Sequence, residues 1–374
     1  MQKESFHVIV IGGGLAGLVS AILLQRQNLK VALIEKKQYP FHRVCGEYVS
    51  NEVVDFLKQH NIYPEFITPS TLNEFVLTSI SGKKASVPLS LGGFGISRYN
   101  FDLFLFESAK AAGVEIITDS VDDVSYSTSK DIFSVILKKN GTLNSKIAIG
   151  AFGKRSNIDR SMDRSFFKKQ SPYIGVKYHI KYNPPTNQVA LHNFEGGYCG
   201  INAIENGKLN LCYLGERSAL KKYGSIPEME KQILHKNPYL KKIFTEAEFL
   251  WDKPEVINEI SFETKMPVEG HILMCGDAAG MITPLCGNGM AMAIHSSKIL
   301  AEEVIDFFHN HKDRKTLERS YKRKWNKQFK NRLSIGRVIQ NLFGSAWLSE
   351  LSVGICKVKP LAKYLVSLTH GKPF

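Results

Sequence analysis

Two glycine-rich segments, about 260 residues apart, have the residue types and spacing that most clearly imply chemistry. The first, Gly12 to Gly17, follows the apolar run His7 to Ile11 and opens a helical stretch from Leu15 to about Gln27. A second apolar run then ends at Glu35. A strand, a glycine loop, a helix, a strand and an acid in this order predict a βαβ unit that binds a dinucleotide.

The residues of this first segment have separate expected roles. Gly12 allows a tight turn, Gly14 lets the backbone approach a diphosphate, and Gly17 lets the helix pack closely on the strand. The positive end of the helix would face the diphosphate. Glu35 would accept hydrogen bonds from both ribose hydroxyls and would repel a 2′-phosphate, so NADP is a poor fit. The expected site also includes Ala16 and Lys36.

The whole-chain composition is that of a folded globular protein. The 374 residues are 43% hydrophobic and 22% charged, and no run of eighteen uninterrupted apolar residues occurs. Lys3-Glu4 leads directly into the first strand without a signal-peptide pattern, and the six cysteines lack CxxC pairing or metal-ligand spacing. We therefore expect a cytoplasmic protein with reduced thiols and no metal site.

The net charge of +14 is concentrated in one segment. Residues 312–332 carry ten Lys or Arg against two acids, and Tyr321, Trp325 and Phe329 recur there every four residues. This spacing places the aromatics on one helix face, which would pack on the protein body or contact an anionic membrane. Nucleic-acid binding is a weaker alternative, because no zinc-finger, helix-turn-helix or RRM-type motif accompanies the charge.

The order of predicted elements indicates an α/β fold built from interrupted pieces. Strand-like segments fall between the parts of the dinucleotide-binding unit, and Glu205-Asn206-Gly207 predicts a hairpin turn between two of them. We expect a Rossmann-like domain interrupted by an antiparallel β-sheet substrate domain, followed by a helical C-terminal region. The expected limits are 1–70, 97–160 and 268–310 for the first domain, 71–96 and 161–267 for the second, and 311–374 for the helical region.

Four short motifs resemble those of a large group of flavoproteins over about residues 1–310. They are Arg43-Val44-Cys45-Gly46-Glu47, Ser97-Arg98-Tyr99-Asn100-Phe101-Asp102-Leu103, Leu273-Met274-Cys275-Gly276-Asp277-Ala278-Ala279-Gly280 and Pro284-Leu285-Cys286-Gly287-Asn288-Gly289-Met290. The group includes geranylgeranyl reductases, flavin-dependent halogenases and aromatic hydroxylases, and the pattern is most similar to the geranylgeranyl-reductase-like branch. The resemblance implies an FAD-dependent oxidoreductase with a GR2-type FAD-binding domain.

The resemblance also implies where FAD binds. Arg43 and Arg98 would lie beside the cofactor, and Asp277, after Gly276, would bind its ribityl chain. The glycines would open a helix aimed at the flavin, whose N-terminus would stabilise negative charge on the reduced ring. The residues expected at this helix start are Gly287, Gly289 and Met290.

The chain departs from each branch of the group at a specific motif. The tryptophans at 251, 325 and 347 cannot supply the Trp-x-Trp-x-x-Pro run of halogenases. Tyr198-Cys199-Gly200-Ile201-Asn202 keeps only the tyrosine of the prenyl-reductase run, and Phe152 replaces an acid that hydroxylases use with pyridine nucleotides. The candidate residues for the substrate pocket are Cys45, Tyr198 and Asn202, and the catalytic residues stay unassigned.

These observations leave several functions open, with one leading hypothesis. The sequence has one dinucleotide fingerprint, so a reductant such as NAD(P)H would reach the flavin from outside. The leading hypothesis is hydroxylation of an apolar aromatic or polyketide-like substrate, and the alternative is reduction of a carbon–carbon double bond in an isoprenoid or other lipid-like substrate. A flavin electron carrier and a nucleic-acid-binding protein are further alternatives. The expected partner is a small apolar organic molecule, with peripheral membrane contact through 312–332 as an additional expectation.

Overall fold

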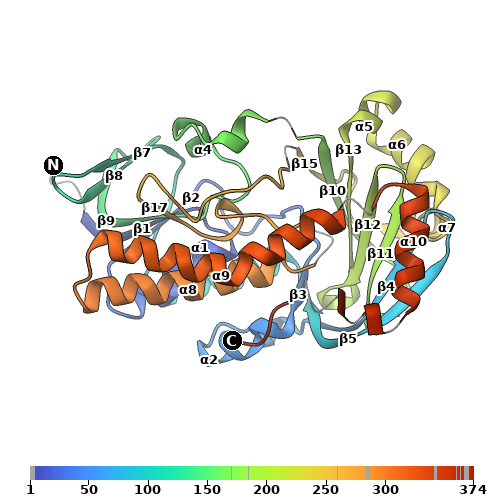
Figure 1. The fold of residues 1–374 in the computed structure, drawn as a ribbon, viewed down its shortest axis with the longest axis horizontal. Coiled ribbons are helices and arrows are strands. Elements are labelled where there is room, and N and C mark those ends of the chain that lie inside the picture. The colour runs from blue at the N-terminus through green and yellow to red at the C-terminus, as the bar shows by residue number, and fades with distance from the viewer. Residues whose placement is uncertain are drawn as a thin grey trace.

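The computed structural model shows two β-sheets side by side along an elongated molecule (Figure 1). It describes residues 5–169, 171–183, 185–258, 260–283, 287–340, 343–358, 360–362, 364–365 and 370–374. Within these ranges, no helix is both long and apolar enough to cross a membrane.

The first sheet has the parallel core that the βαβ pattern predicts. Its order is β16-β17-β9-β1-β2-β6, with β7 and β8 joined to the edge of β9. The bounds are β1 (Ser5–Ile11), β2 (Val31–Glu35), β6 (Glu115–Thr118), β7 (Val121–Ser127), β8 (Ile132–Leu137), β9 (Thr142–Gly150), β16 (Val268–Glu269) and β17 (Ile272–Met274). β1 pairs in parallel with both β2 and β9, and β17 pairs in parallel with β9, so segments from three parts of the chain form one sheet.

Helices cover the first sheet because their apolar residues face it. The first, α1 (Leu15–Gln25), is buried along almost its whole length and packs between α3 (Arg98–Ala111) and α8 (Gly289–His309). The long helix α9 (Arg314–Gln340) packs on α8. The short helices α2 (Val54–Gln59) and α4 (Asn157–Ser161) lie at the margins.

The second sheet forms the other half of the molecule. Its order is β14-β10-β13-β12-β11-β4-β5-β3, with β15 also paired to β10. The bounds are β3 (Tyr48–Ser50), β4 (Ser70–Thr78), β5 (Lys84–Gly95), β10 (Tyr173–Lys181), β11 (Gln188–Phe194), β12 (Gly197–Ala203), β13 (Leu209–Glu216), β14 (Glu248–Phe249) and β15 (Glu255–Asn258). Its pairs are antiparallel except for β4 with β11, and Asn206 turns the predicted hairpin between β12 and β13 with φ of 59°.

Helices also cover the second sheet. The helices α5 (Arg217–Tyr223), α6 (Ile226–Ile233) and α7 (Pro238–Glu246) follow β13, and the last two bury Met229, Ile233, Leu240 and Ile243 with the sheet residues. The helix α10 (Ala346–Lys357) packs on β5 and β4. The predicted α/β fold with an antiparallel second sheet and a helical C-terminal region is confirmed.

Two expectations about organisation can be compared with these contacts. Tyr48–Ser50 lies within the range 1–70 but pairs with β5, so the first segment contributes to both sheets. The domain limits themselves stay a prediction. Of the two alternatives for the basic segment, inward packing of the aromatics is the one observed, because Tyr321, Trp325 and Phe329 are buried in the core of the first sheet.

Candidate active site

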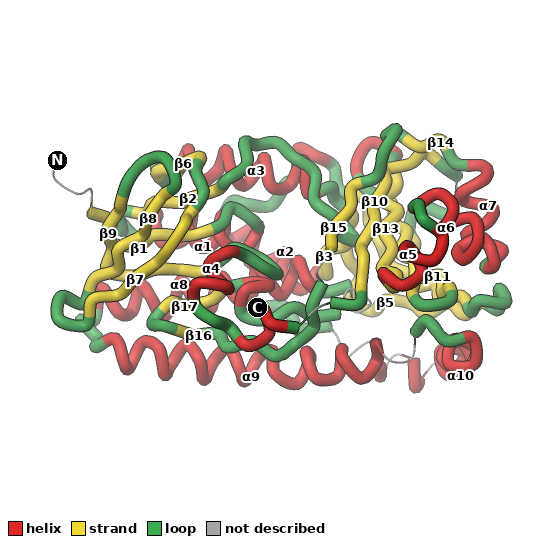
Figure 2. Tube along the Cα trace, turned by 90° about the horizontal axis from the view of Figure 1, so that it is seen from above, coloured by secondary structure: helices red, strands yellow, loops and turns green. Residues whose placement is uncertain are grey.

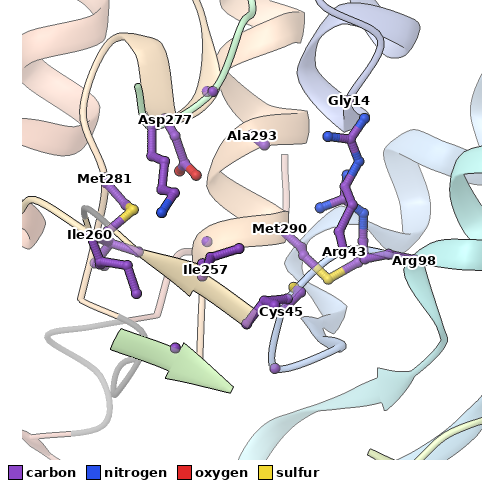
Figure 3. Close-up of a pocket in the computed structure, with 18 of the residues that line it drawn as sticks. Gly14, Arg43, Cys45, Arg98, Ile257, Ile260, Asp277, Met281, Met290 and Ala293 are labelled. Carbon is purple, nitrogen blue, oxygen red and sulfur yellow. The ribbon is translucent and has the colours of Figure 1, made fainter. Parts of the chain in front are cut away.

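One large cavity connects the two sheets. It has a volume of about 960 Å³, and its lining runs from the first glycine loop to the inner residues of the C-terminal helices. Of the site residues expected from the sequence, all except Gly17 line it. They are Gly12, Gly14, Ala16, Glu35, Lys36, Arg43, Cys45, Arg98, Tyr198, Asn202, Gly276, Asp277, Gly287, Gly289 and Met290. In Figure 3, Gly14, Arg43 and Arg98 lie on one side of this cavity, and Asp277 and Met281 lie across it.

The first glycine loop is shaped by close backbone contacts. Gly12 has φ of +108°, and a Cβ there would meet the carbonyl oxygen of Ala151 at 2.4 Å. A Cβ on Gly17 would lie 1.9 Å from the carbonyl oxygen of Gly12, so only glycine lets α1 pack this closely on the end of the strand. Gly17 therefore has a packing role and does not line the cavity. Around Gly14 the space is open, with only Arg98 Nη2 near the position of a Cβ, at 3.7 Å. The loop is therefore closely packed on its strand side and accessible on its cavity side, as the binding of a diphosphate requires.

Glu35 is fixed at the end of β2 by backbone donors. Its Oε2 accepts a hydrogen bond from the Gly13 amide at 3.0 Å, and its Oε1 accepts one from the Lys37 amide at 3.0 Å. Arg43 Nη2 also lies 3.2 Å from Oε2. Because a carboxylate oxygen has two lone pairs, Oε1 keeps acceptor capacity for a ribose hydroxyl.

The two predicted arginines share one carboxylate. Arg98 binds Asp102 through two hydrogen bonds of 2.7 Å, and Arg43 Nε donates to the same carboxylate at 3.0 Å. Burial disfavours charge on Arg98, but the adjacent Asp102 outweighs it and raises the arginine pKa. This network holds both guanidinium groups at the edge of the cavity.

The second glycine loop is held from behind by two buried cations. Lys265 Nζ donates to the backbone oxygens of Asp277, at 2.8 Å, and Lys154, at 2.7 Å. Arg164 Nη1 donates to the Ala278 oxygen at 3.1 Å and pairs with Asp159 at 2.8 Å. Burial lowers the pKa of Lys265 to about 8 and raises the pKa of Asp277. Neither Lys265 nor Arg164 was expected from the sequence, because neither lies in a glycine motif.

The helix expected to face the flavin begins where the sequence indicates. The helix α8 starts at Gly289, and its first residues, Gly289 and Met290, line the cavity. Gly287 has φ of +60°, which favours glycine at this turn. Residues 284–286 of the same motif lie outside the described residues. The free amides and positive dipole of this N-terminus are suited to stabilise negative charge.

A buried charged cluster lies behind Cys45. Glu47 is fully buried and binds Lys177 Nζ, His179 Nε2 at 2.7 Å and the Arg98 amide at 2.7 Å. Burial alone would raise the pKa of Glu47, but Lys177 and His179 outweigh it and lower this pKa. Burial raises the pKa of the Cys45 thiol, so this group stays protonated at neutral pH.

Only part of this cluster has a signal in the sequence. Glu47 ends the Arg43–Glu47 motif, and its place in this motif is the sequence signal that could have identified it. In the structure it has φ of 51°. Lys177 and His179 lie two residues apart on β10, and this spacing matches no catalytic or metal-binding motif. Only the folded chain brings them to Glu47.

The far end of the cavity is an apolar chamber. Its walls include Phe75, Leu77, Leu191 and Leu214 from the second sheet and Ile339 and Phe343 from the C-terminal region. Among the described residues, a Cβ on Gly200 would meet only Leu191 Cδ2, at 3.4 Å, and the Cys212 oxygen, at 3.6 Å, which leaves this part of the wall open. Asn202 lines the cavity, but its amide already donates to the backbone oxygens of Glu47 and Ala203. The contribution of Ile339, Phe343 and the inner residues of α10 to the chamber was not expected from the sequence.

The arrangement fits a dinucleotide that carries a redox ring. The open front of Gly14, the fixed carboxylate of Glu35, the second glycine loop and the start of α8 line one continuous cavity. FAD has the length and the charged groups that such a cavity accommodates. The fold and site therefore define an FAD-dependent oxidoreductase.

The comparison with known families agrees with this class. Residues 5–328 match the model of the FAD binding domain family, described as an FAD binding domain, and the chain belongs to this family.

Three known proteins show how widely the fold is used. The chain is 25% identical to digeranylgeranylglycerophospholipid reductase of Methanosarcina acetivorans over 91% of this chain and 86% of that protein. It superposes on the flavin-dependent brominase Bmp2 with a TM-score of 0.78 and 18% identity, over 98% and 93% of the two chains. It superposes on PqsL of Pseudomonas aeruginosa, a probable FAD-dependent monooxygenase, with a TM-score of 0.76 and 15% identity, over 94% and 100%. The shared fold therefore does not distinguish reduction, halogenation and monooxygenation.

Proposed function

We propose that this oxidoreductase is a monooxygenase that hydroxylates an apolar aromatic or polyketide-like substrate. The observation that carries the proposal is the apolar chamber, which continues from the cofactor part of the cavity and is lined on one side by residues of the C-terminal region. Oxygen chemistry on a flavin needs a pocket from which bulk water is excluded. The open wall at Gly200 leaves room for a ring system beside Leu191.

The residues of this chain would bind and orient the two reactants. Glu35, the Gly14 loop and Asp277 would hold the FAD, and Arg43 and Arg98 would flank it. Bound FAD supplies the redox chemistry, including its reaction with oxygen. The N-terminus of α8 would stabilise negative charge on the reduced ring, and the apolar chamber would place the substrate beside it.

We propose that the reductant comes from outside the chain, with NAD(P)H as the candidate. Gly92-Gly93-Phe94-Gly95 does not form a second nucleotide loop, because it lies within β5 and pairs with β3. By the resemblance to aromatic hydroxylases, Phe152 replaces an acid that those enzymes use with pyridine nucleotides. Phe152 lines the cavity.

A second candidate function is reduction of a carbon–carbon double bond in a lipid-like substrate. Such a reaction needs a hydride donor and a proton donor on the substrate side of the flavin. Cys45 is a protonated thiol that lines the cavity, and the relative from Methanosarcina acetivorans is a reductase by name. Halogenation is not proposed, because the two-tryptophan run of halogenases is absent from the sequence.

Oxygen use separates the two candidates. Holoprotein is incubated with NADH or NADPH and a panel of alkyl-substituted phenols and polyprenyl lipids. We expect substrate-stimulated oxygen uptake and a product heavier by one oxygen atom. Gly200→Trp should remove the stimulation while FAD stays bound, whereas Gly200→Ala should resemble wild type, because its Cβ meets nothing closer than 3.4 Å. Alkene saturation by the reduced protein under strict anaerobiosis, without substrate-dependent oxygen uptake in air, would overturn the proposal in favour of the reductase.

A further inference from the structure

The helix α10 has an apolar stripe on its solvent side. Trp347 is 71% exposed, Leu351 43% and Val358, which directly follows the helix, 54%. Their spacing of four and seven residues places them on one helical face. Leu361 and Tyr364 continue the exposed apolar surface beyond it. Exposed apolar groups that gather in this way usually mark a docking surface.

The opposite side of α10 packs against the second sheet, so the helix is docked on the protein body. Ser349, Ser352 and Val353 are buried, and the helix lies on β5 and β4. Glu350, in the second turn of α10, binds three residues of the β4–β5 turn. They are Ser79, Ser81 and Lys83.

The C-terminal sequence that carries this stripe has a net positive charge. Residues 343–374 contain four lysines against one acid, Glu350, which pairs with Lys83. Figure 2 shows α9 and α10 along the same side of the molecule. The exposed cations of α9 that form no ion pair with a described residue are Lys315, Arg319, Lys322, Arg323, Lys327 and Lys330. A cationic helix on the same side of the molecule as an apolar stripe is complementary to an anionic lipid surface.

The end of α9, Phe343 and α10 also line the substrate chamber. Ile339, Phe343, Ile355 and Cys356 line the cavity from within. The exposed stripe of α10 therefore lies over the chamber wall that its inner residues form.

We propose that the stripe of α10 and the cationic face of α9 form one docking surface for an anionic membrane. The apolar side chains of α10 insert among the lipid headgroups, and the cations of α9 bind lipid phosphates. The buried aromatics of α9 take no part. A further step rests on the proposed function: a substrate with an apolar tail then reaches the chamber from the bilayer beneath α10.

Vesicle flotation tests the docking surface directly. Full-length holoprotein is mixed with vesicles of phosphatidylglycerol and phosphatidylcholine or of phosphatidylcholine alone. We expect flotation with the anionic vesicles only and release by salt, because the Debye length shrinks to about 3 Å at 1 M. Trp347 emission should shift to shorter wavelength on binding, and Trp347→Phe should remove this shift while the protein still floats.

Surface variants distinguish a docking role from a folding role. Trp347→Glu with Leu351→Glu should weaken vesicle binding by about tenfold or more, because the inserted apolar area is lost. Lys322→Glu with Arg323→Glu should weaken it by a similar factor, because each cation near an anionic surface contributes substantially. Ile136→Glu is a matched control, since Ile136 is 40% exposed on β8, at the end of the molecule away from α10 (Figure 1). FAD content and the far-UV spectrum should stay unchanged in all three.

Three results would overturn the proposal. One is absence of flotation with anionic vesicles, and another is equal flotation of the α10 variants and Ile136→Glu. The third is a wild-type dimer in sedimentation that Trp347→Glu with Leu351→Glu dissociates, since the stripe would then be an interface between two copies. Oxygen uptake with a water-soluble phenol tests the proposed function without vesicles, so the two proposals can fail separately.

Discussion

At the scale of single residues, the cofactor part of the cavity is fixed by hydrogen bonds to backbone atoms. Glu35 is oriented by the amides of Gly13 and Lys37, and the carbonyl of Asp277 is held by Lys265. Backbone donors and acceptors move little, so the Glu35 carboxylate and the backbone at Asp277 need no rearrangement when a ligand arrives. The site is therefore organised before the cofactor binds.

Removal of the Glu35 carboxylate should weaken FAD binding. Glu35→Ala loses the acceptor for the ribose and leaves the Gly13 amide without its partner, which should cost about 1–3 kcal/mol of binding free energy. The measurement is FAD retained after gel filtration, with the dissociation constant from flavin fluorescence. Glu65→Ala, at an exposed site near α2, is the control and should bind like wild type. If Glu35→Ala binds FAD as tightly as wild type does, Glu35 does not bind the ribose.

At the scale of elements, buried polar groups join helices to the second sheet. Glu230 on α6 accepts hydrogen bonds from Tyr178 on β10, at 2.9 Å, and from Tyr213 on β13, at 2.8 Å. Burial raises the pKa of Glu230 from 4.5 to about 7, although both tyrosine hydrogen bonds lower it. The contact between α6 and the sheet therefore depends on pH.

The sign of this dependence follows from proton binding. Between pH 4.5 and about 7 the folded protein keeps a proton on Glu230 that the unfolded chain releases. The free energy of unfolding should therefore fall as pH rises through this range, by up to about 3 kcal/mol. Denaturant unfolding at several pH values should show a flatter profile for Glu230→Gln than for wild type. Glu228→Gln, on the same helix, should keep the wild-type profile, and identical profiles for all three proteins would contradict the prediction.

At the scale of the whole molecule, the cavity couples the two sheets. Residues from the first glycine loop, from β3 and from the C-terminal region line the same space. A cofactor bound there contacts groups that belong to both halves of the fold. Its binding free energy should therefore stabilise both halves together.

Thermal unfolding with and without FAD checks this coupling. At a free FAD concentration of about 100 times the dissociation constant, binding should add about 2.7 kcal/mol to the free energy of unfolding. This corresponds to a rise in Tm of roughly 3–4 °C for a chain of this size. Near-UV and far-UV signals should shift together as one transition. A second transition that FAD leaves in place would show that the sheets unfold independently.

The sequence by itself determined the features that depend on neighbours along the chain. The βαβ unit around Gly12 and Gly14, the acid at Glu35, the loop at Asp277 and the start of α8 each lie within one short motif. Local backbone geometry and helix dipoles follow from such motifs, because the residues that matter are a few positions apart.

Only the tertiary structure decided the contacts between distant segments. The pairing of Glu47 with Lys177 and His179 joins residues about 130 positions apart, and the C-terminal helices meet the substrate sheet across a similar or longer separation. The direction of the aromatic stripe of α9 was also open, because a helical period shows that residues share a face but not what that face contacts. Burial, ion pairing and the lining of the chamber depend on which surfaces meet in three dimensions, and no short motif carries that information.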